Sequence, residues 1–242
     1  MAELQGKKLL VIGGSSGIGF AVAHRAGLEG AVLTLLGRNQ ARLDEARALL
    51  VAQGVKVRNI IACDAHDHTA LTASFAQLEP FDHLVSMVGD VMAGGFLKAD
   101  MKTIEHVIHS KFLTNVLIGK LAAKKLRSGG SLTFTAGTGG RAQHACASYV
   151  GNLGIQALAQ GMAAEIAPEG RVNVVAPTWT VTPFWRDQPE LKVEETRQHF
   201  ANLIPLGRTA EIDELASAYL FLMKNDFVTG QQLAIDGGIM LG

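Results

Sequence analysis

Leu9-Leu10-Val11-Ile12-Gly13-Gly14-Ser15-Ser16-Gly17-Ile18-Gly19 joins an apolar run to a cluster of glycines and serines. The run predicts a buried strand, and Phe20–Leu28 after it predicts a helix. Glycines in such a turn let backbone N–H groups approach a diphosphate, which the positive end of the helix dipole also attracts. The segment therefore predicts a phosphate site, with an ordinary turn as the alternative. Its candidate residues are Gly13, Ser15, Ser16, Gly17, Ile18 and Gly19.

The same alternation of short apolar runs and helical stretches continues along the chain. Seven runs predict strands: Leu9–Ile12, Ala31–Leu36, Val55–Ala62, Phe81–Met87, Ser131–Thr135, Arg171–Val175 and Leu233–Ile235. Helices are expected at Phe20–Leu28, Ala41–Gln53, Leu71–Leu78, Met101–Arg127, Ser148–Glu165 and Glu211–Met223. Continuously apolar strands without hairpin turns indicate an α/β fold, a doubly wound sheet of about seven parallel strands with helices on both faces. We expect residues 1–242 to form one domain, with an irregular insert at about 178–205 beside the carboxyl edge of the sheet.

Composition narrows the class of protein. Twenty-two basic side chains balance twenty-two acidic ones, which argues against binding to nucleic acid or to an anionic membrane. No apolar run approaches the roughly eighteen residues of a membrane span, and residues 1–8 lack the apolar core of a signal peptide. The two cysteines, Cys63 and Cys146, are too few for a disulfide framework. We therefore expect a cytoplasmic protein whose partner is a small molecule.

Further segments follow a recognisable pattern: Asp64 after the third strand, Val85–Gly89, Arg171–Pro177, Thr182-Pro183, Thr229–Gln231 and Asp236–Gly238. Together with the Gly-x-x-x-Gly-x-Gly spacing of the turn, this resembles the short-chain dehydrogenase/reductase family over nearly the whole chain. The resemblance implies a Rossmann-type fold, a nicotinamide cofactor and a dimer or tetramer. It places Asp64 at the adenine, Thr182 at the nicotinamide carboxamide, and Val88, Gly89 and Pro177 beside the cofactor. Thr178 departs from the pattern, because a glycine normally follows the proline at 177.

The end of the second strand indicates which nicotinamide nucleotide binds. An acidic residue there would accept hydrogen bonds from a ribose 2′-hydroxyl and repel a 2′-phosphate. This chain has Gly37 at that point, followed by Arg38 and Asn39, and an arginine can form two hydrogen bonds to a phosphate. We predict NADP(H) over NAD(H), with a solvated turn arginine as the alternative.

The resemblance also implies four catalytic groups. These are a tyrosine that moves the proton, a lysine four residues later that lowers the phenol pKa, a serine that binds the substrate oxygen, and an asparagine in a proton relay. Here the tyrosine position falls on Ser148 and the lysine position on Asn152, and no lysine occurs between Lys125 and Lys192. The serine position lands in Ala136-Gly137, and the asparagine position near Ser110, with Asn115 as an alternative only if the helix shifts. The chain is therefore identified as an atypical member that lacks the usual catalytic residues.

Three interpretations remain open for the chemistry. Substitutes could do the work: Tyr149 or Ser148 as proton donor, Lys111 or Arg141 as the charge, Thr135 or Thr138 as the oxygen clamp, beside Asn152. Alternatively, hydride passes to an activated acceptor that needs little acid help, or the protein binds NADP(H) without turning it over. We expect an oxidoreductase acting on a small carbonyl or alcohol, with a non-catalytic sensor or assembly partner as the alternative.

Three other features complete the expectations. Asp64, His66, Asp67 and His68 carry ligand chemistry but lack helical spacing, so we interpret them as a solvated loop and predict no metal site. Trp179, Trp185, Phe184 and Phe200 in the insert line an apolar pocket or pack against neighbouring structure. The apolar segment 230–242 suggests a buried interface between subunits, and hence a homo-oligomer.

Overall fold

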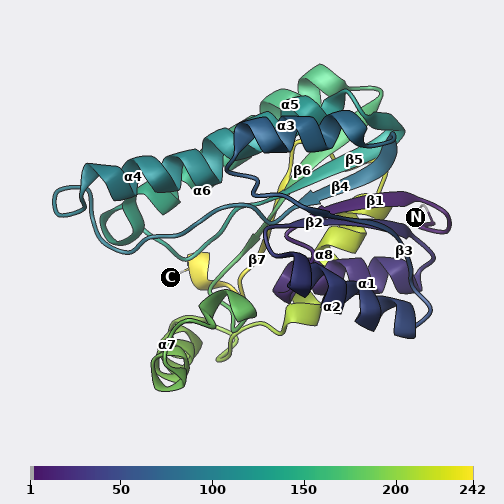
Figure 1. Cartoon of the computed structure of the whole chain (residues 1–242). Helices are drawn as coiled ribbons and strands as arrows, with labels where there is room; N and C mark the ends of the chain where they lie inside the picture. The colour runs from purple at the N-terminus through teal and green to yellow at the C-terminus, as the bar shows by residue number, and fades with distance from the viewer. Residues whose placement is uncertain (1–2, 242) are drawn as a thin grey trace.

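The computed structural model describes residues 3–241, which form a single parallel sheet with helices on both faces (Figure 1). Its strands are β1 (Lys8–Ile12), β2 (Val32–Gly37), β3 (Lys56–Ala62), β4 (Phe81–Ser86), β5 (Leu126–Thr135), β6 (Gly170–Pro177) and β7 (Gln232–Ile235). Their spatial order is β3-β2-β1-β4-β5-β6-β7, and every adjacent pair is parallel. This arrangement confirms the predicted doubly wound, Rossmann-type sheet of seven strands.

Two helical layers cover the sheet. One contains α1 (Gly17–Leu28), α2 (Gln40–Ala52) and α8 (Ile212–Lys224), and the other contains α3 (His68–Gln77), α5 (Thr114–Ala123) and α6 (Ala142–Ile166) (Figure 1). Alternate residues of β1 pack on opposite faces of the sheet. Leu9 and Val11 belong to one apolar cluster, and Leu10 and Ile12 belong to the other. The apolar run of β1 is therefore explained by burial on both faces, whereas the edge strand β3 carries exposed polar residues. Across residues 3–241, no helix combines the length and the apolar character needed to cross a membrane.

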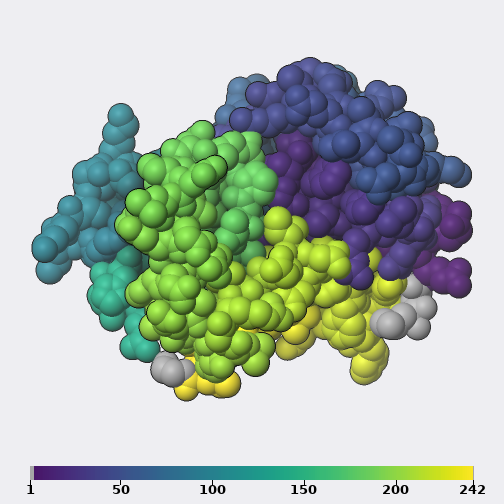
Figure 2. Space-filling model, turned by 90° about the horizontal axis from the view of Figure 1, so that it is seen from below, coloured from purple at the N-terminus to yellow at the C-terminus, as the bar shows by residue number. Residues whose placement is uncertain are grey.

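The strand order reverses between β1 and β4, which places a ligand crevice outside the carboxyl ends of these strands. Ile12 at the end of β1 pairs with Ser86 at the end of β4 and with Leu36 near the end of β2. The segments that follow β1, β4, β5 and β6 therefore meet at one edge. In Figure 2 the segment around α7 (Glu190–Leu203), coloured green, lies against the purple N-terminal part of the chain on this face.

Two predicted boundaries in the middle of the chain were wrong. The predicted strand Ser131–Thr135 begins at Leu126, because Gly129-Gly130 continues the strand instead of turning it. A Cβ at Gly130 would lie 2.3 Å from the Asp82 carbonyl oxygen, so only glycine allows this close passage. The predicted helix Met101–Arg127 ends at Ala123 and is interrupted by a π-helical turn at His109–Leu113, which separates α4 (Met101–Ile108) from α5.

Three other boundaries also differ. α1 begins at Gly17 instead of Phe20, because Gly17 takes the positive φ of +56° that the turn into the helix requires. α6 begins at Ala142, six residues before the predicted start, and is kinked at Ala145, whose φ is −143° and ψ is 29°. The insert at 178–205 is not irregular throughout, since it contains a 3-10 turn at Pro183–Trp185 and the 14-residue helix α7.

The free energy of unfolding is expected to fall in acid because of His83 on β4. This side chain is buried against Ser131, with 2.9 Å between His83 Nδ1 and Ser131 Oγ, and burial lowers its pKa from 6.5 to about 4. Between these two pH values, His83 is therefore protonated in the unfolded chain and neutral in the folded chain. We expect about 3 kcal/mol of stability, present above pH 6.5, to be lost as the pH falls through 4.

Urea titrations at several pH values, on wild type and on His83→Asn, measure this loss. The asparagine keeps a polar group near Ser131 but cannot ionise, so part of the acid sensitivity between pH 6.5 and 4 should disappear. The exposed His199 on α7 provides the control, since His199→Asn should leave the pH dependence unchanged. Identical curves for wild type and His83→Asn would contradict the assignment.

Candidate active site

The turn after β1 has a backbone that only glycine tolerates. Gly13 has a φ of +86° and Gly17 a φ of +56°, and Gly13 N donates to the Leu36 carbonyl at 2.8 Å. A Cβ at Gly19 would lie 2.2 Å from the Gly13 carbonyl oxygen, so the first turn of α1 packs directly on the glycine turn. The sequence pattern thus folds into a tight strand-to-helix connection with its amides at the crevice.

The N-terminus of α1 is suited to an anion. Its N-cap residue, Ser16, makes no side-chain cap, and no acidic residue occupies the first turn. The first backbone N–H groups of a helix lack intrahelical partners and carry partial positive charge. The cradle therefore fits a diphosphate, with Ser15 and Ser16 hydroxyls at its rim.

The insert reaches back to this cradle. A Cβ at Gly17 would lie 3.7 Å from Thr182 Cβ and 3.5 Å from Pro183 Cδ, and Arg186 donates to Ser16 Oγ at 3.0 Å. Thr182 accepts from Phe184 N at 3.3 Å and caps the 3-10 turn. Thr182 is thus beside the turn that the sequence predicted to hold the cofactor. Arg186 was missed, because a contact across 170 residues leaves no signal in the sequence.

The end of β2 is open where a ribose phosphate would lie. Gly37 stands beside Ser15, and the Arg38 side chain is exposed. Asn39 serves as the N-cap of α2, because its Oδ1 accepts from Arg42 N at 3.0 Å. Of these residues, Arg38 keeps its polar group for a ligand, whereas the Asn39 side chain is already used by the helix.

The loop after β3 is organised by its own acidic residues. Asp64 Oδ1 accepts from His66 N at 3.0 Å, and Asp67 caps α3 by accepting from Thr69 N and Ala70 N at 3.0 and 2.9 Å. Within the described part of the chain, no three His, Cys, Asp or Glu side chains come together as metal ligands. Asp64 is exposed beside the crevice, as an adenine contact requires.

A buried polar network fixes the segment after β4. Ser86 Oγ donates to Asn115 Oδ1 at 2.7 Å, and Asn115 Nδ2 donates to the carbonyls of Val88 and Lys111 at 3.0 and 2.7 Å. Asn115 therefore stabilises the π-helical turn and the backbone at Val88. Both N–H groups of its amide are used by these carbonyls, and its Oδ1 accepts from Ser86.

Lys111 is buried at the same place. A Cβ at Gly89 would lie 2.9 Å from its Cγ, and a Cβ at Gly151 would lie 2.9 Å from its Cδ, so its stem passes between two glycines. The residue is 5% exposed. Burial lowers the pKa of the ammonium group from 10.5 to about 8, against a smaller opposing effect of Asp90.

On α6 the three candidate residues have different surroundings. Ser148 Oγ accepts from Met92 N at 2.7 Å and lies 3.3 Å from Met92 O, so its hydroxyl anchors the segment after β4. Tyr149 is half-buried, and no hydrogen bond joins its hydroxyl to residues 3–241. Asn152 lies against Gly137, whose Cβ would be 3.2 Å from Asn152 Nδ2.

The two threonine candidates at the end of β5 lie in different surroundings. Thr135 Oγ1 lies 2.7 Å from the Ser86 carbonyl and 2.8 Å from Tyr219 Oη on α8, so it is committed to the interior. Thr138 instead lies at the crevice, where its N donates to the Pro177 carbonyl at 2.9 Å. Arg141, the N-cap residue of α6, is exposed.

Three buried polar atoms near the ends of β5 and β6 lack partners among the described residues. They are Thr138 Oγ1, Asn152 Oδ1 and Thr178 Oγ1. Gly137 and Gly139 bring them together, since a Cβ at Gly139 would lie 2.9 Å from Thr178 Oγ1. An unsatisfied buried polar atom costs about 1–3 kcal/mol, so such a group indicates a site for a polar ligand. The residues present therefore fit a bound nucleotide and substrate.

The aromatic residues of the insert pack on one another. Trp179 stacks on Trp185 and on Phe200 of α7, with ring centroids 5.8 and 5.6 Å apart, and Phe184 meets Trp185 edge-on at 4.8 Å. Trp185 Nε1 also donates to the Thr180 carbonyl at 3.0 Å. This cluster holds α7 and the 3-10 turn as one unit beside the crevice.

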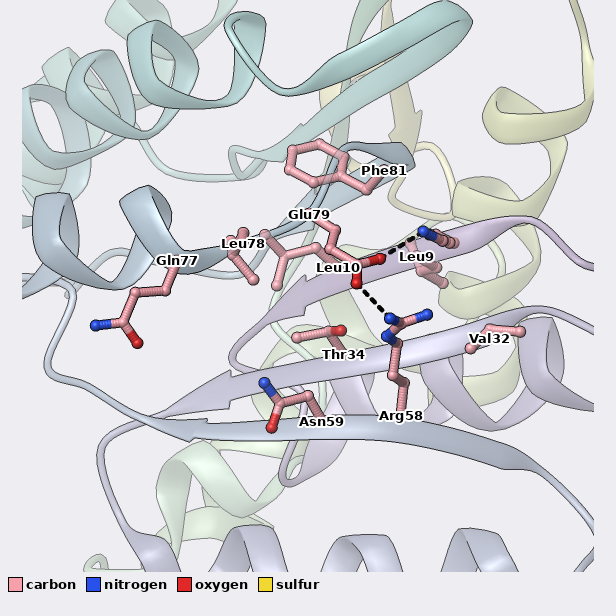
Figure 3. A pocket seen from close by; sticks show the side chains of 11 residues that line it. Leu9, Leu10, Val32, Thr34, Arg58, Asn59, Gln77, Leu78, Glu79 and Phe81 are labelled. Atoms are coloured by element: carbon pink, nitrogen blue, oxygen red, sulfur yellow. Dashed lines mark hydrogen bonds and ion pairs between the residues drawn. The ribbon is translucent and has the colours of Figure 1, made fainter.

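A separate pocket lies at the opposite end of the sheet (Figure 3). Its walls include Lys8 and Val32, the first residues of β1 and β2, and Phe81, the first residue of β4. Glu79 accepts from Lys8 Nζ at 2.7 Å and from Arg58, so the charged groups in this pocket neutralise one another. Its position and its internal ion pairs separate it from the crevice at the carboxyl edge.

Comparison with known proteins gives the family. A family model described as Enoyl-(Acyl carrier protein) reductase matches residues 13–240. Short-chain dehydrogenase/reductase fsr5 of Gibberella fujikuroi is 29% identical over 258 residues, covering 100% of this chain and 97% of that protein. The chain belongs to the short-chain dehydrogenase/reductase family. Its members are NAD(P)-dependent oxidoreductases, which agrees with a phosphate-binding turn at the switch point of the sheet.

Two further similarities support membership of the short-chain dehydrogenase/reductase family. Galactitol 2-dehydrogenase (L-tagatose-forming) of Cereibacter sphaeroides is 32% identical over 254 residues, covering 98% of this chain and 96% of that protein. The crystal structure of a small-chain dehydrogenase in complex with NADPH matches with a TM-score of 0.84 and 27% identity, covering 98% of this chain and all of that one. The same fold therefore binds NADPH in a relative.

Proposed function

We propose that this short-chain dehydrogenase/reductase is an NADP(H)-dependent oxidoreductase that acts on a small carbonyl or alcohol. The observation that carries the proposal is the glycine turn packed on an uncapped, acid-free start of α1, at the carboxyl edge of β1. When bound, the nicotinamide cofactor supplies or accepts a hydride. The residues proposed to hold it are Gly13, Ser15, Ser16, Gly17, Ile18, Gly19, Arg38, Asn39, Asp64, Val88, Gly89, Pro177 and Thr182.

The preference for the 2′-phosphate rests on Gly37 and Arg38. Replacing Arg38 by alanine should weaken NADPH binding about 10- to 100-fold, because a hydrogen bond to a charged group contributes about 1.5–3 kcal/mol. NADH affinity should change less than about threefold, since NADH has no 2′-phosphate to lose a partner. Fluorescence titration of both nucleotides measures the ratio, and the exposed Arg47 on α2 gives the control variant Arg47→Ala. Equal losses for the two nucleotides would contradict the role of Arg38.

The proton donor is proposed to be non-standard. No lysine follows Lys125 before Lys192, and the hydroxyl of Ser148 is occupied by the Met92 backbone. Of the candidate catalytic residues, Tyr149, Asn152 and Lys111 remain. Tyr149 lies one position after Ser148, or about 100° round the helix. Substitution of Tyr149 by phenylalanine should leave the rate unchanged if another group supplies the proton.

A second candidate function is a nucleotide-binding relative without turnover, acting as a sensor or an assembly partner. It is favoured by the same two facts, the fully engaged Ser148 hydroxyl and the absence of a lysine on α6. Exposed apolar residues such as Val150, Leu153 and Met240 agree with a homo-oligomer, a dimer or a tetramer, in either case.

One experiment separates the two functions. NADPH binding is followed by fluorescence, and NADPH consumption is followed at the same time with a panel of small aldehydes, ketones and enones. The oxidoreductase proposal requires consumption that depends on the carbonyl compound. Tight binding without turnover of any compound would overturn it in favour of the non-catalytic alternative.

A further inference from the structure

Lys111 is held in an enclosed position from which only its ammonium group can act. Its Cγ and Cδ fill the spaces above Gly89 and Gly151, at the exit of β4 and on the inner side of α6. Gly151 lies one helical turn after Ser148 and directly before Asn152, so the stem of Lys111 packs beside the candidate residues of α6. Any side chain at position 89 or 151 would collide with this stem.

Asp90 follows Gly89 and is the one carboxylate whose charge acts on Lys111. The two groups do not form an ion pair within 4.0 Å, so the effect of Asp90 on Lys111 acts through space. The backbone of Asp90 is fixed by Ser110 Oγ, which accepts from Asp90 N at 3.2 Å. The Asp90 side chain is 32% exposed, so its carboxylate lies partly at the surface.

His106 on α4 contacts this carboxylate. Its Nε2 lies 2.7 Å from Asp90 Oδ2, and its side chain is 60% exposed. His66, from the loop after β3, lies on the other side with its Nε2 3.9 Å from the same oxygen. Asp90 thus acts electrostatically on the buried amine and directly contacts an exposed imidazole.

Other ionisable groups around these side chains are few. Arg38 lies near His66 and lowers its pKa together with burial, which is the larger cause. α6 contributes His144, Cys146 and Tyr149 between Ala142 and Asn152. None of these acts on Lys111; among residues 3–241, Asp90 is the charged group that does.

We propose that Lys111 gives the proton to the reacting substrate oxygen and that Asp90 and His106 return protons to it from solvent. This inference rests on the proposed oxidoreductase function. In the reduction, the hydride forms a C–H bond at the carbonyl carbon, and the electron pair of the C=O π bond moves to oxygen. That oxygen takes a proton from Lys111 Nζ, NADPH is oxidised, and the neutral amine regains a proton through Asp90 and His106.

The acid strength of Lys111 suits this task. With a pKa of about 8, the amine is protonated at pH 7 and still transfers its proton more readily than an ordinary lysine. The rate of reduction should therefore fall as the pH rises through about 8, and oxidation of the alcohol should gain over the same range, because oxidation needs the neutral amine.

The first test uses the cofactor-free protein and needs no activity. NMR titration of the Lys111 side chain should give a pKa near 8, and Asp90→Asn should lower it further, because the Asp90 charge favours the ammonium form. Glu105→Gln, an exposed carboxyl beside His106 on α4, is the control and should leave it unchanged. An ordinary lysine pKa, or no response to Asp90→Asn, would overturn the coupling.

The second test is kinetic. Lys111→Met should lower the rate of reduction about 100-fold or more and remove the fall near pH 8, while NADPH binding stays within threefold of wild type. His106→Gln and Asp90→Asn should raise the solvent deuterium isotope effect, and Glu105→Gln should not. If wild type turns over and Lys111→Met keeps its rate and pH profile, only the proton path fails. If the wild-type protein converts none of the carbonyl compounds, both the proton path and the proposed oxidoreductase function are contradicted.

Discussion

Substitution of Gly19 by alanine is expected to weaken NADP(H) binding by about 100-fold or more. The added Cβ would lie 2.2 Å from the Gly13 carbonyl oxygen and 2.9 Å from its carbon, both of them backbone atoms that cannot rotate away. The start of α1 must therefore move away from the glycine turn. Two misplaced backbone donors to a charged phosphate cost about 3–6 kcal/mol, which corresponds to at least about 100-fold in affinity.

The chain offers a matched control for this substitution. Gly161 lies on the exposed side of α6, and a Cβ there would meet nothing within 4 Å. Gly161→Ala should bind NADPH normally and gain about 0.5–1 kcal/mol of stability, as alanine does over glycine within helices. Fluorescence titration gives the affinities, and circular dichroism shows whether each variant is folded. A folded Gly19→Ala protein with affinity close to wild type would refute the assignment of the turn.

Replacing Lys111 by methionine is expected to stabilise the protein by up to about 3 kcal/mol at pH 7, because its pKa falls from 10.5 to about 8 on folding. Methionine keeps a stem of similar length between Gly89 and Gly151 and removes the buried charge. The sign follows from linkage. Between pH 8 and 10.5 the unfolded chain holds a proton that the folded chain has released, so wild-type stability rises with pH in that range.

Chemical denaturation from pH 7 to 10.5 measures this effect. The advantage of Lys111→Met should be largest at pH 7 and shrink as the pH approaches 10.5, where the lysine is neutral in both states. Lys120→Met removes an exposed lysine on α5 and should change stability by less than about 0.5 kcal/mol at every pH. A Lys111→Met protein less stable than wild type at pH 7 would contradict the burial cost. A costly buried amine that the protein retains agrees with a functional role.

Most of the fold could be predicted from the sequence, because strands buried on both faces are continuously apolar and their alternation with helices permits few topologies. The parallel sheet was confirmed. The errors lie where long-range contacts override local signals. Gly129-Gly130 resembles a turn but continues β5 past Asp82, and the helical pattern of residues 101–127 hides a π-helical turn held by Asn115.

The site could be predicted only in part. The glycine turn and Arg38 could be proposed from the sequence because the roles proposed for them depend on local backbone and on charge. The engagement of Ser148 by Met92, the pair Asp90 and His106, and the contact of Arg186 with Ser16 depend on tertiary packing. The replacement of glycine by Thr178 was the one sequence signal for the group of unpaired polar atoms beside Asn152.

The central claim is that the main-chain amides of the glycine turn bind a dinucleotide. Isothermal titration calorimetry with both coenzymes tests this claim most directly. We expect saturable binding of NADPH and of NADP+, with NADH at least about tenfold weaker than NADPH, as the proposed contact of Arg38 with the 2′-phosphate requires. No heat with any of these nucleotides, from protein shown to be folded, would contradict the account.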